Sequence, residues 1–307
     1  MKWLAKAALQ KLLSALPAGE KLNYHLQRRL TKTLPRGRRA ILDRFRTALG
    51  NFQAARHHGR PPAAPATAYE FGAGWELGVA LCLYMLGVER QVVVDLRPLL
   101  NLELLNDALA KLGQLAALIE PGGASRLRPL PAEPILGQAG LEERLGITYL
   151  APRDARATGL PAGSFDIISS SQVLEHIPQE DLVPILAECR RLLSPRGVLC
   201  LEVDMHDHFH YFEPGIGPYN FLRFSPGAWR LINSGLHFQN RLRLPDYLHA
   251  VEQAGLAVVQ RAVTWPSAQD LQRLRALPLA ARFANGRYRP YELAARSLRL
   301  VCCRAKG

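Results

Sequence analysis

The sequence predicts an α/β protein whose core is a doubly wound, mostly parallel sheet. Three consecutive segments between Tyr69 and Asp95 support this fold class: an apolar run ending in a glycine-rich turn (A-Y-E-F-G-A-G), a helical stretch that stops at Gly87, and a valine run ending in an acid (R-Q-V-V-V-D-L). An unbroken run of β-branched residues is typical of a parallel strand buried on both faces. The segment is therefore predicted to form a strand, a turn, a helix and a second strand.

The chain after Asp95 continues to alternate between helical and strand patterns, as expected for such a sheet. We expect seven strands with the last one antiparallel, and helices on both faces. The further strands are predicted over 147–152, 165–170, 198–204, 256–263 and 297–304. Helices are predicted over 102–118, 171–177, 181–193, before Gly255 and within 266–295, and a Pro/Gly-rich loop or insertion over 120–140.

An N-terminal helical arm and linker is predicted over residues 1–66, and the main domain over 67–307 with an acceptor-covering insertion at about 205–245. The arm reads as helices over 3–16, 20–34 and 40–49, followed by a Pro/Ala linker at 61–66. The first helix carries apolar residues along one side and polar residues along another; these are Leu4, Ala8, Leu12 and Leu16, and Lys2, Lys6 and Gln10.

Positive charge is concentrated in the arm. Residues 1–60 hold 14 Lys and Arg against only Glu20 and Asp43, out of a net charge of +13 for the whole chain. The arm is interpreted either as a packing lid with a solvated basic face or as a site for a membrane surface, a phosphorylated substrate or nucleic acid. Nucleic acid ranks last because few aromatic residues interleave with the charges.

Composition is that of a globular protein, with 48% apolar and 21% charged residues among 307. Lys6 and Lys11 interrupt the apolar N-terminus, so no export signal is predicted. The five cysteines are odd in number and form no C-x-x-C motif, which indicates reduced thiols. A cytoplasmic location is expected, with peripheral contact at the inner membrane surface as a further possibility.

The glycine turn predicts a nucleoside-type cofactor. Glycines at this position let the backbone approach such a ligand, and Asp95 at the end of the next strand can bind both hydroxyls of a ribose. The third glycine of a dinucleotide fingerprint would fall at Leu77, and Glu70 would repel a pyrophosphate. A carboxylate suits a cationic ligand instead, and a dehydrogenase remains a minor alternative.

In these residues, and in the later F-D-I-I and V-L-E-H-I-P motifs, the chain resembles the class I S-adenosylmethionine-dependent methyltransferases, whose fold is Rossmann-like. The second signature is similar to that of the type 11-like enzymes for small molecules, quinone precursors and sugars. The resemblance implies a cofactor site made of a methionine end, a ribose end and an adenine end. Its residues are Glu70, Gly72, Ala73, Gly74, Asp95, Leu96, Asp154, Ala155, Ser171 and Gln172.

Transfer of a methyl group to a hydroxyl needs positioning of the two reactants and removal of a proton. His208 is one candidate base, with His176 beside the cofactor edge. Alternatively Glu175, His176 and His208 bind a divalent metal such as magnesium, as in related metal-dependent enzymes, although Gln172 stands where some of those have a second glutamate. A third reading is that Glu175 and His176 only cap and pack a helix.

The loop from 205 to 245 is predicted to cover the acceptor, with Tyr219, Asn220, Arg223 and Arg241 as contact residues. Its polar residues favour a saccharide or glycolipid, whereas a pocket apolar throughout would indicate a small phenol or quinone precursor. Asn23 and Tyr24 of the arm are candidates to close over the site. The alternative outside enzymology is a non-catalytic relative that binds an anionic membrane or nucleic acid through the arm.

Overall fold

The computed structural model describes residues 2–16, 33–59, 66–116 and 127–305, together with Gly19, Leu22, Tyr24, His25 and Arg28. Asn23, most of the predicted helix 20–34, nearly all of the linker 61–66 and the first part of the loop 120–140 lie outside these residues.

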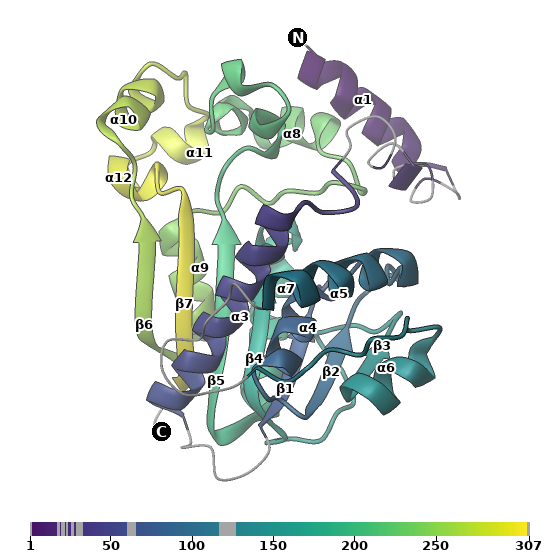
Figure 1. The fold of residues 1–307 in the computed structure, drawn as a ribbon. Coiled ribbons are helices and arrows are strands. Elements are labelled where there is room, and N and C mark those ends of the chain that lie inside the picture. The colour runs from purple at the N-terminus through teal and green to yellow at the C-terminus, as the bar shows by residue number, and fades with distance from the viewer. Residues whose placement is uncertain are drawn as a thin grey trace.

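A seven-stranded sheet with strand order β3-β2-β1-β4-β5-β7-β6 forms the core (Figure 1). Neighbouring strands from β3 through β5 pair in parallel, and β7 pairs antiparallel with both β5 and β6. The predicted fold class is therefore confirmed. The strands are β1 Thr67–Phe71, β2 Arg90–Val94, β3 Ile147–Leu150, β4 Phe165–Ser171, β5 Leu193–Asp204, β6 Leu256–Thr264 and β7 Ser297–Arg304.

Helices bury an apolar stripe against each face of the sheet, which is how amphipathic elements remove apolar surface from water. On one face lie α7 Gln179–Leu192 and α9 Leu244–Gln253. On the other lie α3 Arg38–His58, α4 Gly78–Met85, α5 Leu102–Ala116 and α6 Gln138–Leu145.

Helix α3 is longer than the predicted 40–49. Ile41, Phe45, Ala48 and Ala54 recur at helical spacing and are buried, so the inner side of the helix belongs to the core. The end of the arm is therefore packed against the sheet, and part of its positive charge lies over the domain.

The predicted helix at 171–177 is wrong. β4 runs to Ser171, and a single 3-10 turn, η1 Leu174–His176, separates it from α7. Pro178 takes the N-cap position of α7 and confines this turn to three residues.

A cap lies beyond the carboxyl ends of the parallel strands (Figure 1). Its core joins the N-terminal helix to the insertion and to the segment between β6 and β7, through Trp3, Phe209, Phe221, Trp229 and Phe283. The cap elements are α1 Lys2–Ser14, η2 His208–Tyr211, η3 Pro214–Ile216, η4 Asn220–Arg223, α8 Pro226–Ile232, α10 Ala268–Arg275, α11 Ala281–Ala284 and α12 Pro290–Leu293.

The five cysteines are free thiols, four of them buried and Cys303 half-buried. Among the described residues, no helix is both long enough and apolar enough to cross a bilayer.

Candidate functional site

The glycine turn after β1 is shaped to admit a ligand. Gly72 and Gly74 have φ values of 77° and 75°, which side-chain-bearing residues rarely adopt. A Cβ at Gly72 would lie 2.6 Å from the methyls of Val173, whereas a Cβ at Gly74 would meet nothing within 4 Å. The turn therefore leaves open space above Gly74 and is closely packed at Gly72.

Helix α4 begins only after Leu77, which is itself left-handed with φ 52°. Leu77 therefore turns the chain and does not belong to the helix, and its side chain is fully buried. The turn between β1 and α4 is thus extended by Trp75, Glu76 and Leu77.

Two buried acids flank this turn. Glu70 is 5% exposed and Asp95 is 4% exposed. Burial raises the pKa of Glu70 to about 8, with Arg44 opposing, and raises that of Asp95 to about 7 despite hydrogen bonds from Tyr149 and the turn backbone. One carboxylate oxygen of each acid has no hydrogen-bond partner among the described residues. Such atoms fit a ligand that supplies cationic groups and hydroxyls.

A pocket joins several of the predicted cofactor residues. Gly72, Leu96, Asp154 and Ala155 line it together, and His176 lines the same pocket. Its remaining lining residues are Phe71, Val94, Arg153, Arg156, Val173, Ile177, Pro178, Asp181 and Ile185. The predicted adenine end and the predicted catalytic turn therefore lie on one cavity.

An ion pair with Arg156 positions the Asp154 carboxylate at the pocket. Arg156 donates to its carboxylate at 2.6 Å and to Asp181 at 2.7 Å. These hydrogen bonds keep the pKa of Asp154 below its usual value. The carboxylate is partly exposed, so it remains accessible from the pocket.

Ser171 ends strand β4 and Gln172 follows it, and neither lines this pocket. Gln172 is left-handed with φ 59°, and its backbone N–H donates to Glu202 at 2.8 Å. Both positions lie at the carboxyl edge of the sheet, and their contact with a cofactor stays a prediction.

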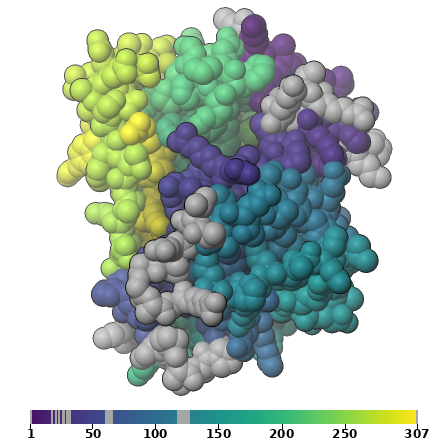
Figure 2. Space-filling view, viewed as in Figure 1, coloured from purple at the N-terminus to yellow at the C-terminus, as the bar shows by residue number. Residues whose placement is uncertain are grey.

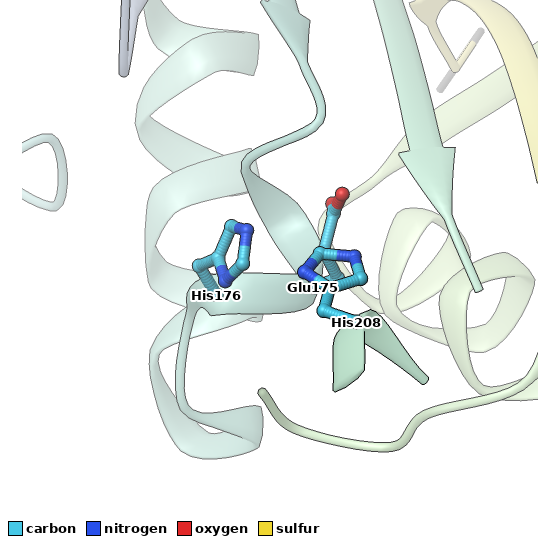
Figure 3. Close-up of side chains that lie close together, drawn as sticks. All are labelled: Glu175, His176 and His208. Atoms are coloured by element: carbon cyan, nitrogen blue, oxygen red, sulfur yellow. The ribbon is translucent and has the colours of Figure 1, made fainter. Parts of the chain in front are cut away.

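Glu175, His176 and His208 converge on one point. Glu175 and His176 project from the turn η1, and His208 comes from the loop after β5 (Figure 3). One ligand atom from each residue lies within 4.8 Å of the others. The carboxylate and the two imidazoles thus form a set that could hold a divalent cation.

The protonation of this trio follows from burial. Glu175 is 1% exposed, and burial raises its pKa well above the usual value. Its Oε1 accepts from the Asp204 N–H at 3.3 Å, while Oε2 has no partner among the described residues. Burial also lowers the pKa of His176 to about 4, and its Nδ1 lies 2.6 Å from Phe238 O. His176 is therefore neutral at pH 7 with Nδ1–H donating, which leaves Nε2 as a base or ligand.

Sequence reasoning missed His237. Its ring lies 5.5 Å from that of His208 and 5.7 Å from that of His176. Burial and these two imidazoles lower the pKa of His237 to about 3. The isolated histidine in S-G-L-H-F-Q-N carries no local motif, so only the fold brings it to the site.

Asp204 and Tyr211 complete the surroundings of His208. Asp204 Oδ2 lies 3.4 Å from His208 Nε2 and accepts from the Tyr211 hydroxyl at 2.6 Å, while Oδ1 is 2.7 Å from His206 Nδ1. Burial opposes ionisation of Asp204, yet the hydrogen bonds from these partners hold its pKa below the usual value. An ionised Asp204 therefore orients both imidazoles.

The segment after His237 also fixes the turn η1. Asn240 Nδ2 donates to the carbonyls of Leu174 and Ile177 at 2.7 and 2.8 Å, and its Oδ1 accepts from Tyr247. The turn that carries Glu175 and His176 is thus clamped by a second chain segment.

The predicted acceptor residues are mostly engaged inside the cap. Tyr219 donates to Ala294 O at 2.8 Å and Asn220 donates to Asp207 at 3.2 Å. Arg241, 4% exposed, donates to the carbonyls of Phe221 and Phe224. Arg223 is exposed. These contacts give the first three a structural role, and acceptor contact by all four stays a prediction.

The arm reaches the glycine turn. The ring of Tyr24 lies 5.1 Å from that of Trp75, and Arg28 donates to Tyr24 and pairs with Glu103. Arg36 forms an ion pair with the buried Glu76. Tyr24 therefore lies next to the turn, and closure of the arm over the site stays a prediction.

Residues 137–201 match a family model described as a methyltransferase domain. The ubiquinone biosynthesis O-methyltransferase of Nitrosococcus oceani is 28% identical over 185 residues, which cover 60% of this chain and 67% of that protein.

Solved methyltransferase structures also resemble the chain. A geranyl diphosphate methyltransferase in complex with SAM is 14% identical, with a TM-score of 0.45 over 84% of this chain and 85% of that one. A TehB-like SAM-dependent methyltransferase from Corynebacterium glutamicum is 13% identical, with a TM-score of 0.41 over 84% and 87%.

Proposed function

We propose that this chain, which is a class I S-adenosylmethionine-dependent methyltransferase, transfers the methyl group to a hydroxyl oxygen of a small acceptor. The observation that carries the proposal is the convergence of Glu175, His176 and His208 beside the pocket that Gly72 and Asp154 line. A neutral imidazole at that place can receive a proton while the cofactor presents its methyl group.

In this proposal the cofactor lies along the glycine turn. The Asp95 carboxylate accepts from the ribose hydroxyls, and Asp154 and Ala155 contact the adenine. Glu70 lies toward the methionine end, where its buried carboxyl meets the positive charge of the ligand. Ala73, Leu96, Ser171 and Gln172 belong to the same proposed site.

The same trio fits a divalent cation. Glu175 Oε2 is buried and has no hydrogen-bond partner among the described residues. His208 Nε2 lies 3.4 Å from Asp204 Oδ2, a long contact that a cation could replace, and His176 Nε2 is left free by the bond at Nδ1. A bound cation would supply charge that favours the deprotonated acceptor hydroxyl. Magnesium prefers oxygen ligands, and two imidazoles suit manganese or zinc as well, so the choice of metal is part of the test.

The residues of the chain orient the reaction. Phe238 O fixes the tautomer of His176, so Nε2 faces the trio with its lone pair. Asp204 holds His208 through Nε2 in the structure as it stands. Asn240 keeps the turn η1 in place. Together they give the precise placement on which an in-line displacement depends.

For the acceptor we propose a small phenol or quinone precursor with adjacent hydroxyls. Asn220 and Arg241, which favoured a polar acceptor in the sequence, are buried in contacts within the cap, and the name of the Nitrosococcus relative supports a ubiquinone precursor. A saccharide or glycolipid is the second candidate, because the exposed Arg223 remains available for an anionic acceptor. The free thiols support a reducing, cytoplasmic location.

The test begins with metal-stripped protein and labelled S-adenosylmethionine, offered 3,4-dihydroxybenzoate-type phenols or sugars with magnesium, manganese or zinc. We expect transfer to a phenol, and a loss of at least about 100-fold in Glu175→Gln and His208→Ala. Both variants should bind S-adenosylhomocysteine as the wild type does. His249→Ala, whose side chain is 61% exposed on α9, is the matched control.

Three results would contradict the proposal in different ways. Absence of S-adenosylhomocysteine binding would exclude the cofactor site. Full activity after metal removal would exclude the cation. Full activity of both variants would exclude the trio.

A further inference from the structure

The outward side of α1 is an apolar surface that no described part of the chain covers. We define the α1 outer face as Leu4, Ala8, Leu9 and Leu12 of α1 together with Leu16 just beyond its end, all of which are exposed. Leu12 is 65% exposed, and the other three leucines are between 39% and 46% exposed. Apolar side chains that gather on one face of a surface helix indicate a partner.

The opposite side fixes the helix in this orientation. Trp3, Ala7 and Leu13 are buried, and the Trp3 ring lies 5.4 Å from Phe209 in the cap. The Trp3 N–H donates to Glu213 at 2.8 Å. Because the helix is anchored through this side, it cannot rotate to bury the α1 outer face against the domain.

Lysines flank the apolar face. On a helical wheel Lys2 and Lys11 lie at its two margins, and both are exposed. Lys11 donates to the carbonyls of Arg230 and Asn233 at the end of α8, which brings the 79% exposed Leu231 next to α1. Figure 2 shows α1, in deep purple, at the molecular surface.

From these observations we propose that the α1 outer face binds the surface of an anionic lipid bilayer. An apolar face bordered by lysines is the pattern of a helix that lies in the plane of a membrane interface. Anionic headgroups complement the exposed Lys2 and Lys11 at the two margins of this face. A second copy of the chain would instead bring two cationic helices together.

The inner side of the same helix lies near His237, the histidine beside His176 and His208. Lys6 lies 4.6 Å from the centre of the Phe212 ring, and its charge acts on His237. Helix α1 is thus a layer between the bilayer and the proposed acceptor region. Under the proposed function this arrangement suits an acceptor that partitions into lipid, although bilayer binding itself does not depend on that reaction.

The experiment is flotation of the full chain with vesicles of phosphatidylcholine containing about one-third phosphatidylglycerol. We expect binding that falls at least about tenfold with pure phosphatidylcholine, and at least about tenfold in Leu12→Glu. Leu136→Glu is the matched control, because Leu136 is 88% exposed and lies before α6. Circular dichroism and S-adenosylhomocysteine binding should be the same for all three proteins, which separates this test from that of the reaction.

Two outcomes would overturn the inference. Equal flotation of Leu12→Glu and wild type would show that the α1 outer face is not the contact. Absence of flotation, with a concentration-dependent dimer that Leu12→Glu dissociates, would assign this face to self-association.

Discussion

Asp95 provides the sharpest test of the cofactor site, because its carboxylate should weaken folding and strengthen binding. In the structure burial raises its pKa from 3.8 to about 7. The folded protein therefore holds this proton more tightly than the unfolded chain does. The free energy of unfolding therefore falls as pH rises from about 4 to about 7, because the folded protein must give up a proton that it holds more tightly than the unfolded chain does. Above pH 7 the whole destabilising effect of the buried carboxylate is present.

The two magnitudes can be worked separately. A shift of about three pKa units corresponds to about 4 kcal/mol, so Asp95→Asn should raise the free energy of unfolding by about 2 to 4 kcal/mol at pH 8 and by little at pH 4. The same change removes a charged acceptor from two ribose hydroxyls, each hydrogen bond contributing about 1.5 kcal/mol or more. S-adenosylhomocysteine affinity should therefore fall at least about 100-fold.

Calorimetric titration at pH 8 and urea unfolding at pH 4 and pH 8 measure both effects. Asp43→Asn, at an exposed ion pair with Arg46 on α3, is the control and should change neither quantity. Unchanged affinity in Asp95→Asn would refute the ribose assignment. An unchanged free energy of unfolding of Asp95→Asn at pH 8 would refute the argument from burial. The affinity and the free energy of unfolding are measured independently.

Two further predictions concern close packing and buried charge. In Gly72→Ala the new Cβ would meet Val173 at 2.6 Å on a left-handed backbone, so we expect a loss of about 2 to 4 kcal/mol in urea unfolding and at least tenfold weaker cofactor binding. Gly113→Ala in α5, where a Cβ meets nothing within 4 Å, should instead raise the free energy of unfolding by about 0.5 to 1 kcal/mol. Equal changes in Gly72→Ala and Gly113→Ala would contradict the packing argument. Arg243 is fully buried and donates to two backbone carbonyls, so Arg243→Met should cost about 2 to 4 kcal/mol in thermal unfolding. The exposed Arg230→Met should stay within about 0.5 kcal/mol, and a neutral Arg243→Met would show that the two carbonyls find other donors.

The strands, and the antiparallel direction of the last one, could be predicted from the sequence. Each strand is a short apolar run that ends in a turn. The valines of β2 and the apolar run of β4 are both local signals. The packed side of α1 could not be read in the same way. Its leucine stripe was compatible with packing on the domain or with contact to a partner, and in the structure Trp3 and Leu13 are the buried residues. Which apolar side of a short helix packs depends on the partner surface, and the cap is assembled from distant segments.

The residues of the candidate site also fall into two groups, those that a local motif reveals and those that only the fold brings together. Glu175 and His176 are adjacent in sequence, and their motif could be recognised locally. His237 could not, because it reaches them only through the fold of the cap. Arg241 was read as an acceptor residue from its polarity, but its contact with two carbonyls depends on a left-handed backbone at φ 63° that the sequence pattern does not reveal.

The position of β7 between β5 and β6 has a consequence for synthesis. As the ribosome delivers the chain from its N-terminus, β5 and β6 emerge before the strand that joins them to one another. Until β7 arrives, β5 presents an unpaired edge and β6 has no neighbour in the sheet, which is the state in which strands pair wrongly. We therefore expect the nascent chain to need protection by a chaperone until Ser297–Arg304 has left the ribosome.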